Sequence, residues 1–114
     1  MAPPSPLAIA TSSVNRLVKE EASYHKELKH QEARVEKLLA SKDEDENAEY
    51  QLKQERTAIE ETRAVFPPLL QRIEDALHRL EDQLATGEAN GASETEIKNA
   101  KETIAKAKEL ASAK

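Results

Sequence analysis

The stretch Val65-Phe66-Pro67-Pro68-Leu69-Leu70 lies near the centre of a helix-like segment that runs from Glu44 to Leu84. Two adjacent prolines remove two backbone donors and clash with the preceding turn, which costs roughly 3 kcal/mol or more in a helix interior. The flanking residues are apolar, however, and this run contains no Gly, Asn, Asp or Ser that would build a reversal. The sequence therefore predicts one long helix with a kink at Pro67-Pro68, rather than two helices joined by a loop.

The spacing of apolar residues supports this interpretation. Every seventh position across the prolines is apolar, at Leu52, Ile59, Phe66, Ile73 and Leu80. A seam with this repeat is typical of helices that pack side by side. We expect the helix to span residues 44–85.

A second periodic segment precedes this helix. Thr11, Ser12 and Ser13 offer hydroxyl caps, and apolar residues then recur at alternating three- and four-residue steps. Glu21 and Gln31 occupy the two seam positions that lack an apolar residue. The pattern predicts a helix over residues 11–41. Residues 1–10, which include three prolines, are expected to form a disordered or extended lead-in.

A third helix is predicted over residues 94–112. Thr86-Gly87 is a candidate left-handed cap for the middle helix, and Ser93-Glu94-Thr95-Glu96 has the form of a capping box. The expected buried stripe of this helix comprises Ile97, Ala100, Ile104, Ala107 and Ala111, with Leu110 beside it.

Short connections make consecutive helices antiparallel neighbours. Residues 11–112 are therefore predicted to form a single all-α domain, an up-down-up antiparallel three-helix bundle of coiled-coil-like character. The third helix is the shortest, and it should end at about the level of Pro67. The prolines would then divide a three-helix body from a two-helix arm, with Phe66 packed near Tyr24.

The composition narrows the functional classes. Of the 114 residues, 34% are charged, and the chain has three aromatic residues, two glycines and no cysteine. Long solvated helices with a thin core account for this composition, and a deep ligand pocket is not expected. Without cysteine there is no disulfide or thiolate chemistry.

The formal charge of −5 is unevenly distributed. Residues 11–42 carry seven Lys/Arg against five Asp/Glu, whereas residues 43–86 carry five against twelve. No segment is basic enough to favour nucleic-acid binding. The N-terminus has no basic residue before Arg16 and only a short apolar run, so neither a signal peptide nor a membrane span is expected, and the cytosol is the default location.

No cofactor, metal site or catalytic site is predicted. His25 and His30 are about 140° apart around a helix, which does not suit a metal pair. Asp43-x-Asp45-x-Asn47 opens like a calcium loop but lacks its glycine and its final bidentate Glu. No nucleophile motif or phosphate-binding loop is present, so we do not expect an enzyme. The charged face of segment 11–41 is either simply solvated or a polar docking surface for another protein.

Several matched positions show a resemblance to a known family. Arg16-Leu17-x-Lys19-Glu20 is followed by Tyr24, Glu27 and Gln31-Glu32, then by Tyr50 with Leu52-Lys53-Gln54, and by a proline after an apolar pair in mid-helix. In this order and spacing the chain resembles the tubulin-binding cofactor A family over about residues 7–112. It departs from the family pattern in its second proline, Pro68, and in a longer and more acidic first loop.

The resemblance implies a non-enzymatic tubulin-folding cofactor. Such a protein would capture quasi-native β-tubulin after its release from the cytosolic chaperonin and hand it on towards the α/β heterodimer, with other folding cofactors as indirect partners. It would be cytoplasmic and associated with the cytoskeleton. The resemblance implies a β-tubulin-binding surface on the first helix, formed by Arg16, Lys19, Glu20, Tyr24, Glu27, Gln31 and Glu32. The alternative is a generic helical scaffold or coiled-coil oligomerisation module, because the same seam could pair between chains in a homodimer.

Overall fold

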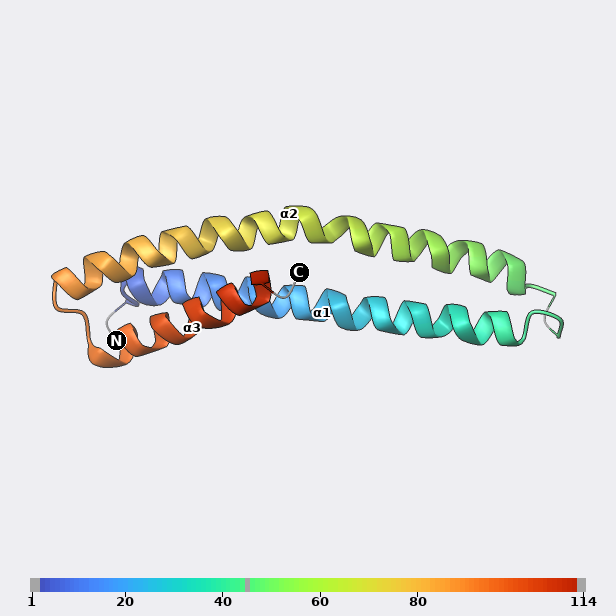
Figure 1. Ribbon diagram of the computed structural model, residues 1–114, viewed down its shortest axis with the longest axis horizontal. Coiled ribbons are helices and arrows are strands. Elements are labelled where there is room, and N and C mark those ends of the chain that lie inside the picture. The colour runs from blue at the N-terminus through green and yellow to red at the C-terminus, as the bar shows by residue number, and fades with distance from the viewer. Residues whose placement is uncertain (1–2, 45, 113–114) are drawn as a thin grey trace. The chain divides into compact units, whose positions relative to one another are not determined.

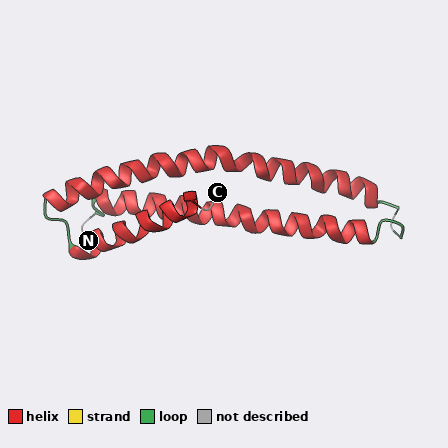
Figure 2. Ribbon diagram, viewed as in Figure 1, coloured by secondary structure: helices red, strands yellow, loops and turns green. Residues whose placement is uncertain are grey.

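Three helices make up the regular structure of this chain. The computed structural model describes residues 3–44 and 46–112, with side chains as far as residue 111. Within these ranges the regular elements are α1 (Pro6–Ala40), α2 (Ala48–Ala89) and α3 (Glu94–Ser112) (Figures 1 and 2). The prediction of an all-α, three-helix fold is confirmed. None of the described helices is both long and apolar enough to cross a lipid bilayer.

The chain divides into two compact units, and the division falls at the prolines. Unit 1 consists of Met1–Glu20 and Leu69–Lys114, and unit 2 of Glu21–Pro68. Unit 1 contains parts of all three helices, whereas unit 2 is an antiparallel pair formed by α1 and α2. A three-helix part and a two-helix part were expected with this boundary. That residues 11–112 act as a single domain stays a prediction.

The start of α1 corrects the predicted lead-in. The helix begins at Pro6 and not at residue 11. Ser5 is its N-cap, because the Ala8 amide donates to Ser5 Oγ at 3.0 Å, and proline suits the first helical position. Thr11 lies inside the helix, where its hydroxyl donates to the Leu7 carbonyl at 2.9 Å. The helix therefore gains one and a half turns that place Leu7 in the core of unit 1.

Helix α2 runs without interruption through Pro67 and Pro68. Both prolines are exposed, and so are Arg63 and Ala64, whose carbonyls lose their usual helical donors. Solvent can satisfy those carbonyls, which makes an uninterrupted helix physically acceptable here. The break is thereby excluded, while the kink itself stays a prediction. Buried residues continue on both sides at steps of three, four or seven residues, at Leu52, Ile59, Thr62, Leu69, Ile73, Ala76 and Leu80.

The end of α2 lies four residues beyond the predicted position, at Ala89. Gly91 has a φ of 75°, and the Ala92 amide donates to the Gly87 carbonyl at 2.8 Å, as in a Schellman motif. The predicted cap at Gly87 is wrong, because this residue is helical. Its small size serves packing instead: a Cβ at Gly87 would lie 3.2 Å from both Leu7 Cδ2 and Ala92 Cβ.

The first connection is a turn that begins α2 later than expected, at Ala48 and not at residue 44. The Glu44 amide donates to the Ser41 carbonyl at 3.0 Å, and Ser41 Oγ donates to the Lys37 carbonyl at 3.1 Å. Residues 41–44 thus turn away from the end of α1. Asp45, part of the acidic tract noted in the sequence, lies outside the described residues.

Helix α3 begins as predicted, at Glu94. The Glu96 amide donates to Ser93 Oγ at 3.1 Å, which confirms the serine half of the capping box. The other half is wrong, because Glu96 Oε1 accepts a hydrogen bond from Ser5 Oγ, at the start of α1, at 2.8 Å. The buried line of α3 also differs from the predicted stripe: Ala100, Thr103 and Ala107 are buried, whereas Ala111 is exposed.

Candidate functional site

Three of the predicted binding residues belong to unit 1. Arg16 and Lys19 are exposed on α1, and Glu20 is half-buried. Within residues 3–44 and 46–112, neither basic side chain forms an ion pair, so both charges are available to a partner. Their role in binding stays a prediction, and the structure shows which residues surround them.

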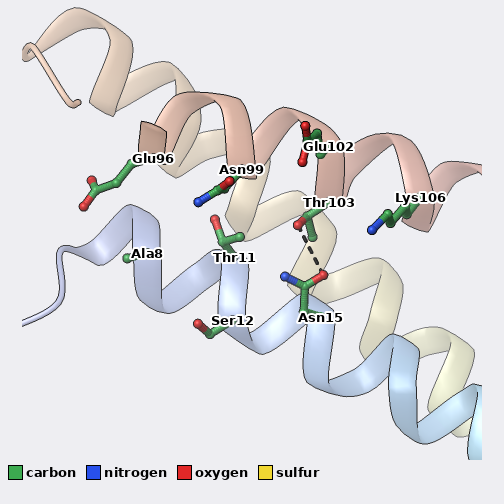
Figure 3. Close-up of a pocket in the computed structure, with 9 residues that line it drawn as sticks. All are labelled: Ala8, Thr11, Ser12, Asn15, Glu96, Asn99, Glu102, Thr103 and Lys106. Carbon is green, nitrogen blue, oxygen red and sulfur yellow. Dashed lines mark hydrogen bonds between the residues drawn. The ribbon is translucent and has the colours of Figure 1, made fainter. Parts of the chain in front are cut away.

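A polar groove of about 300 Å³ lies between α1 and α3 in unit 1 (Figure 3). Thr103 of α3 reaches across it, and its hydroxyl donates to Asn15 Oδ1 at 3.2 Å. The groove is lined from α1 by Ala8, Thr11, Ser12 and Asn15, and from α3 by Glu96, Asn99, Glu102, Thr103 and Lys106.

The groove has an acidic end and a basic end. Figure 3 shows Glu96 at one end and Lys106 at the other. Residues four apart share a helix face, so Lys19 lies one turn beyond Asn15, and Arg16 one turn beyond Ser12. Three cations therefore lie towards the Lys106 end. Amide, hydroxyl and ammonium groups in this arrangement can bind the carbonyls and carboxylates of a protein partner.

The other four predicted residues, Tyr24, Glu27, Gln31 and Glu32, belong to unit 2. Glu27 and Glu32 are exposed, whereas Gln31 is buried, as its seam position indicated. Gln31 Nε2 donates to Glu27 Oε1 at 3.3 Å, so the buried amide holds the exposed carboxylate. The Gln31 side chain thus lies beneath Glu27 and supports it, and its own role in binding stays a prediction.

Arg34 extends this arrangement to α2. Its guanidinium lies 3.6 Å from Glu27 Oε1 and 3.2 Å from Glu55 Oε1. The ion pair between Arg34 and Glu55 joins the two helices in the antiparallel register of unit 2. An ordered carboxylate loses less side-chain entropy when it binds a partner than a freely rotating one does. Glu27 is thus partly preorganised as a contact.

Tyr24 packs against Phe66, as expected. The ring centroids are 6.5 Å apart and the planes meet at 79°, which is an edge-to-face contact. His25 stacks on the same ring at 4.5 Å, and its Nε2 contacts a carboxylate oxygen of buried Glu21. Tyr24 is half-buried, so it is mainly a packing residue of unit 2.

Several residues that form these surroundings were not among the predicted site residues. The contact between Arg34 and Glu55 could have been predicted from the sequence. The expected register, with Tyr24 opposite Phe66, places residue 34 close to residue 55. His25 and Glu21 are four residues apart on one helix, and this spacing was a signal for their contact. The polar groove could not have been predicted from the sequence, since it depends on which faces of α1 and α3 meet.

The described residues do not suggest a metal centre. Among residues 3–44 and 46–112, no group of three or more His, Cys, Asp or Glu side chains is placed to hold a metal ion. The geometry instead offers polar surfaces on α1, each with its own support from a neighbouring helix. Such surfaces are suited to binding another protein.

Comparison with known proteins points to one family. Residues 2–104 match the family model described as tubulin binding cofactor A. Tubulin-specific chaperone A of Saccharomyces cerevisiae is 33% identical over 111 residues, covering 97% of this chain and 98% of the relative. Tubulin-folding cofactor A of Arabidopsis thaliana is 37% identical over 101 residues, covering 87% and 85%. The crystal structure of the tubulin folding cofactor A from Arabidopsis thaliana aligns with a TM-score of 0.74 at 35% identity, over 90% of this chain and 92% of that one.

Proposed function

This chain belongs to the tubulin binding cofactor A family, and from that premise we propose that it is a non-enzymatic tubulin-folding cofactor. It captures quasi-native β-tubulin after release from the cytosolic chaperonin and passes it on towards the α/β heterodimer. The cytoplasm, in association with the cytoskeleton, is its place of action. The observation that carries the proposal is the family match over nearly the whole chain, combined with unpaired charges on an exposed face of α1.

The proposed contacts on α1 fall into two groups. In unit 1 they are Arg16 and Lys19, at the basic end of the polar groove, with Glu20 beside them. In unit 2 they are Glu27 and Glu32. Gln31 and Tyr24 support this second group from within, because Gln31 holds Glu27 and Tyr24 packs on Phe66.

The chemistry of these contacts suits a transient carrier. Exposed charges raise the rate of encounter with a complementary surface more than they raise affinity. A cofactor that must release its client gains from such contacts, because a large desolvated apolar interface would slow release. We therefore expect binding of β-tubulin to weaken as the salt concentration rises.

Charge reversal on α1 tests the proposal, one unit at a time. Lys19→Glu and Glu27→Lys should each weaken co-purification of β-tubulin while circular dichroism stays helical. Lys98→Glu on α3 and Glu61→Lys on α2 are matched controls, because both residues are exposed and lie outside the proposed contacts. Unchanged binding in Lys19→Glu and Glu27→Lys would remove these α1 residues from the contact surface.

A pull-down with separated tubulin subunits tests the choice of client. Retention of β-tubulin with little α-tubulin is the expected result. Sedimentation of the same samples addresses the competing function of a coiled-coil oligomerisation module. A soluble 1:1 complex with β-tubulin supports the cofactor, and a stable homodimer without affinity for tubulin would contradict it.

A further inference from the structure

A second groove in unit 1, between α2 and α3, has a different character from the polar one. It encloses about 570 Å³ and lies along the last turns of α3. Its walls are mainly aliphatic, and the lining residues are Leu70, Ile73, Leu77, Ala107, Leu110 and Ala111, with Glu74, His78, Glu81 and Lys108 along the rim.

Small side chains on α3 create this groove. Ala107 is buried, but Ala111, the next position of the predicted buried stripe, remains exposed. A larger residue at position 111 would occupy part of the groove, because Ala111 lines it. The apolar stripe of α3 therefore extends beyond the part that α2 covers. Among the described residues, this leaves the groove open to a further element.

The dimensions of the groove suit an α-helix. Leu70 and Leu77 are seven residues apart on α2, which corresponds to about 10.5 Å along the helix axis. An incoming amphipathic helix offers apolar side chains at the same i, i+7 spacing, with a third at i+3 or i+4 between them. Leu110 of α3 closes the opposite wall.

The charged residues along the rim favour an occupant that carries positive charge. Glu74, with a side chain 63% exposed, and Glu81, 37% exposed, line the α2 edge two turns apart. Lys108 lies 3.2 Å from Glu81 and partly neutralises it. Glu74 is 3.9 Å from His78 and is the more open carboxylate. A lysine or arginine on the occupant would pair with Glu74 along this edge.

A second copy of this chain fits the groove poorly. Two-fold pairing with α2 against α2 would bring the Glu74 and Glu81 edge of one copy against the same edge of the other. Like charges placed opposite each other at an interface oppose association. The net charge of −5 adds to this repulsion.

We propose that the groove between α2 and α3 is a docking site for a basic amphipathic helix of the client. The helix inserts three aliphatic side chains between Leu70, Leu77 and Leu110, and it places a lysine or arginine beside Glu74. The identification of the client as tubulin rests on the proposed function, whereas the chemistry of the groove does not.

Filling the groove is the direct test. Ala111→Trp should occupy it without removing a core contact, because Ala111 is exposed. Glu74→Lys should place a cation where the occupant needs a carboxylate. Ala111→Trp should weaken tubulin binding about tenfold or more, as the loss of a central contact does, and Glu74→Lys should weaken it by a smaller factor, because Glu74 lies on the exposed rim. Ala105→Trp on α3 and Asp75→Lys on α2 are the matched controls, since both residues are exposed and neither lines the groove.

A synthetic probe separates the groove from the client. A 14-residue helical peptide with leucines at i, i+3 and i+7 and flanking lysines should bind the wild-type chain in fluorescence anisotropy. It should lose affinity for Ala111→Trp and Glu74→Lys but not for the two controls. Equal binding of the same peptide with glutamates in place of its lysines would overturn the charge assignment, and equal binding to all variants would overturn the groove.

Photocrosslinking identifies the natural occupant. With benzoylphenylalanine in place of His78, whose side chain is 69% exposed on the rim and does not fill the groove, the expected product joins this chain to a lysine- or arginine-containing helical segment of tubulin. A crosslink to a second copy of this chain would overturn the proposal. If the chain binds the peptide at the groove but retains no tubulin, the proposed function fails while the groove assignment stands.

Discussion

Leu7 provides the sharpest test of where this fold begins. The sequence alone predicts that residues 1–10 are disordered or extended, whereas the structure places Leu7 in helix α1 with 3% of its surface exposed. It belongs to the core cluster that includes Val14, Leu80 and Ala100. In a frayed lead-in, Leu7→Ala would change the free energy of unfolding by less than about 0.5 kcal/mol.

In the packed position the cost of Leu7→Ala is much larger. Removing three methyl(ene)-type carbons from a fully buried leucine destabilises a protein by about 2–5 kcal/mol, from lost burial and the cavity that remains. With a urea m-value of about 1–3 kcal/mol/M, the unfolding midpoint should fall by about 1 M or more. Ile9→Ala is the matched control, because Ile9 lies in the same turn but is 53% exposed. Equal midpoints for the two variants would refute the packing of this segment.

Gly87 turns the same experiment into a double-mutant cycle. A Cβ at Gly87 would lie 3.2 Å from Leu7 Cδ2 and from Ala92 Cβ, so Gly87→Ala must displace a neighbour. Against this, alanine is favoured over glycine by about 1 kcal/mol in a helix interior. Truncation of Leu7 removes one of the two crowded contacts. Gly87→Ala should therefore be more favourable in the Leu7→Ala background than in the wild type, by about 0.5 kcal/mol or more. Additive effects would show that the two residues do not touch.

Two further stability predictions concern the ends and the centre of the helices. Ser93→Ala removes the side chain that accepts the Glu96 amide, so it should lower the free energy of unfolding by about 1 kcal/mol, whereas Thr95→Ala, at an exposed position, should change it by less than half as much. Pro67→Ala with Pro68→Ala restores two backbone donors on the exposed side of α2 and should raise the free energy of unfolding by about 1–3 kcal/mol, measured in urea. A loss of stability in the double variant would mean that the prolines themselves contribute packing.

The helical period could be predicted from the sequence because burial follows it closely. The seven-residue step from Leu52 to Leu80 predicted a helix through Pro67-Pro68, and α2 is uninterrupted there. Glu21 and Gln31 occupy seam positions and are buried despite their polarity. The buried face of a helix is determined by all of its apolar positions together, so two polar residues on that face do not change which face is buried.

The start of α1 and the end of α2 were harder to predict, because two chemically valid caps competed at each of them. Ser5-Pro6 and the hydroxyls of residues 11–13 are both start signals, and the structure uses the first because it buries Leu7. Gly87 and Gly91 are both possible left-handed caps. The structure uses Gly91, since a helical Gly87 allows close packing against Leu7. Tertiary contacts decide between local signals of similar strength.

Side-chain arrangements were the least predictable part of the candidate site. The contacts of Thr103 with Asn15, and of His25 with Phe66, depend on rotamers and on which helix faces meet. In the sequence, Thr103 is a polar residue next to an apolar stripe, and the predicted buried stripe included Ile104 instead. Thr103 is buried because α1 packs beside α3, and this packing could not be predicted from the sequence.

The polar residues of unit 2 also bear on whether this seam pairs within the chain or between chains. Gln31 donates to Glu27 and Arg34 lies beside Glu27 within α1, whereas the pair between Arg34 and Glu55 of α2 is the contact of this group that depends on the register. A shifted pairing would separate Arg34 from Glu55 and leave the partly buried carboxylate of Glu55 without its ion pair, which costs free energy. An all-aliphatic seam would lose little in such a shift. The polar seam therefore gives up some burial of apolar surface and favours one register of α1 against α2, whereas the preference for this hairpin over a coiled-coil oligomer stays a prediction.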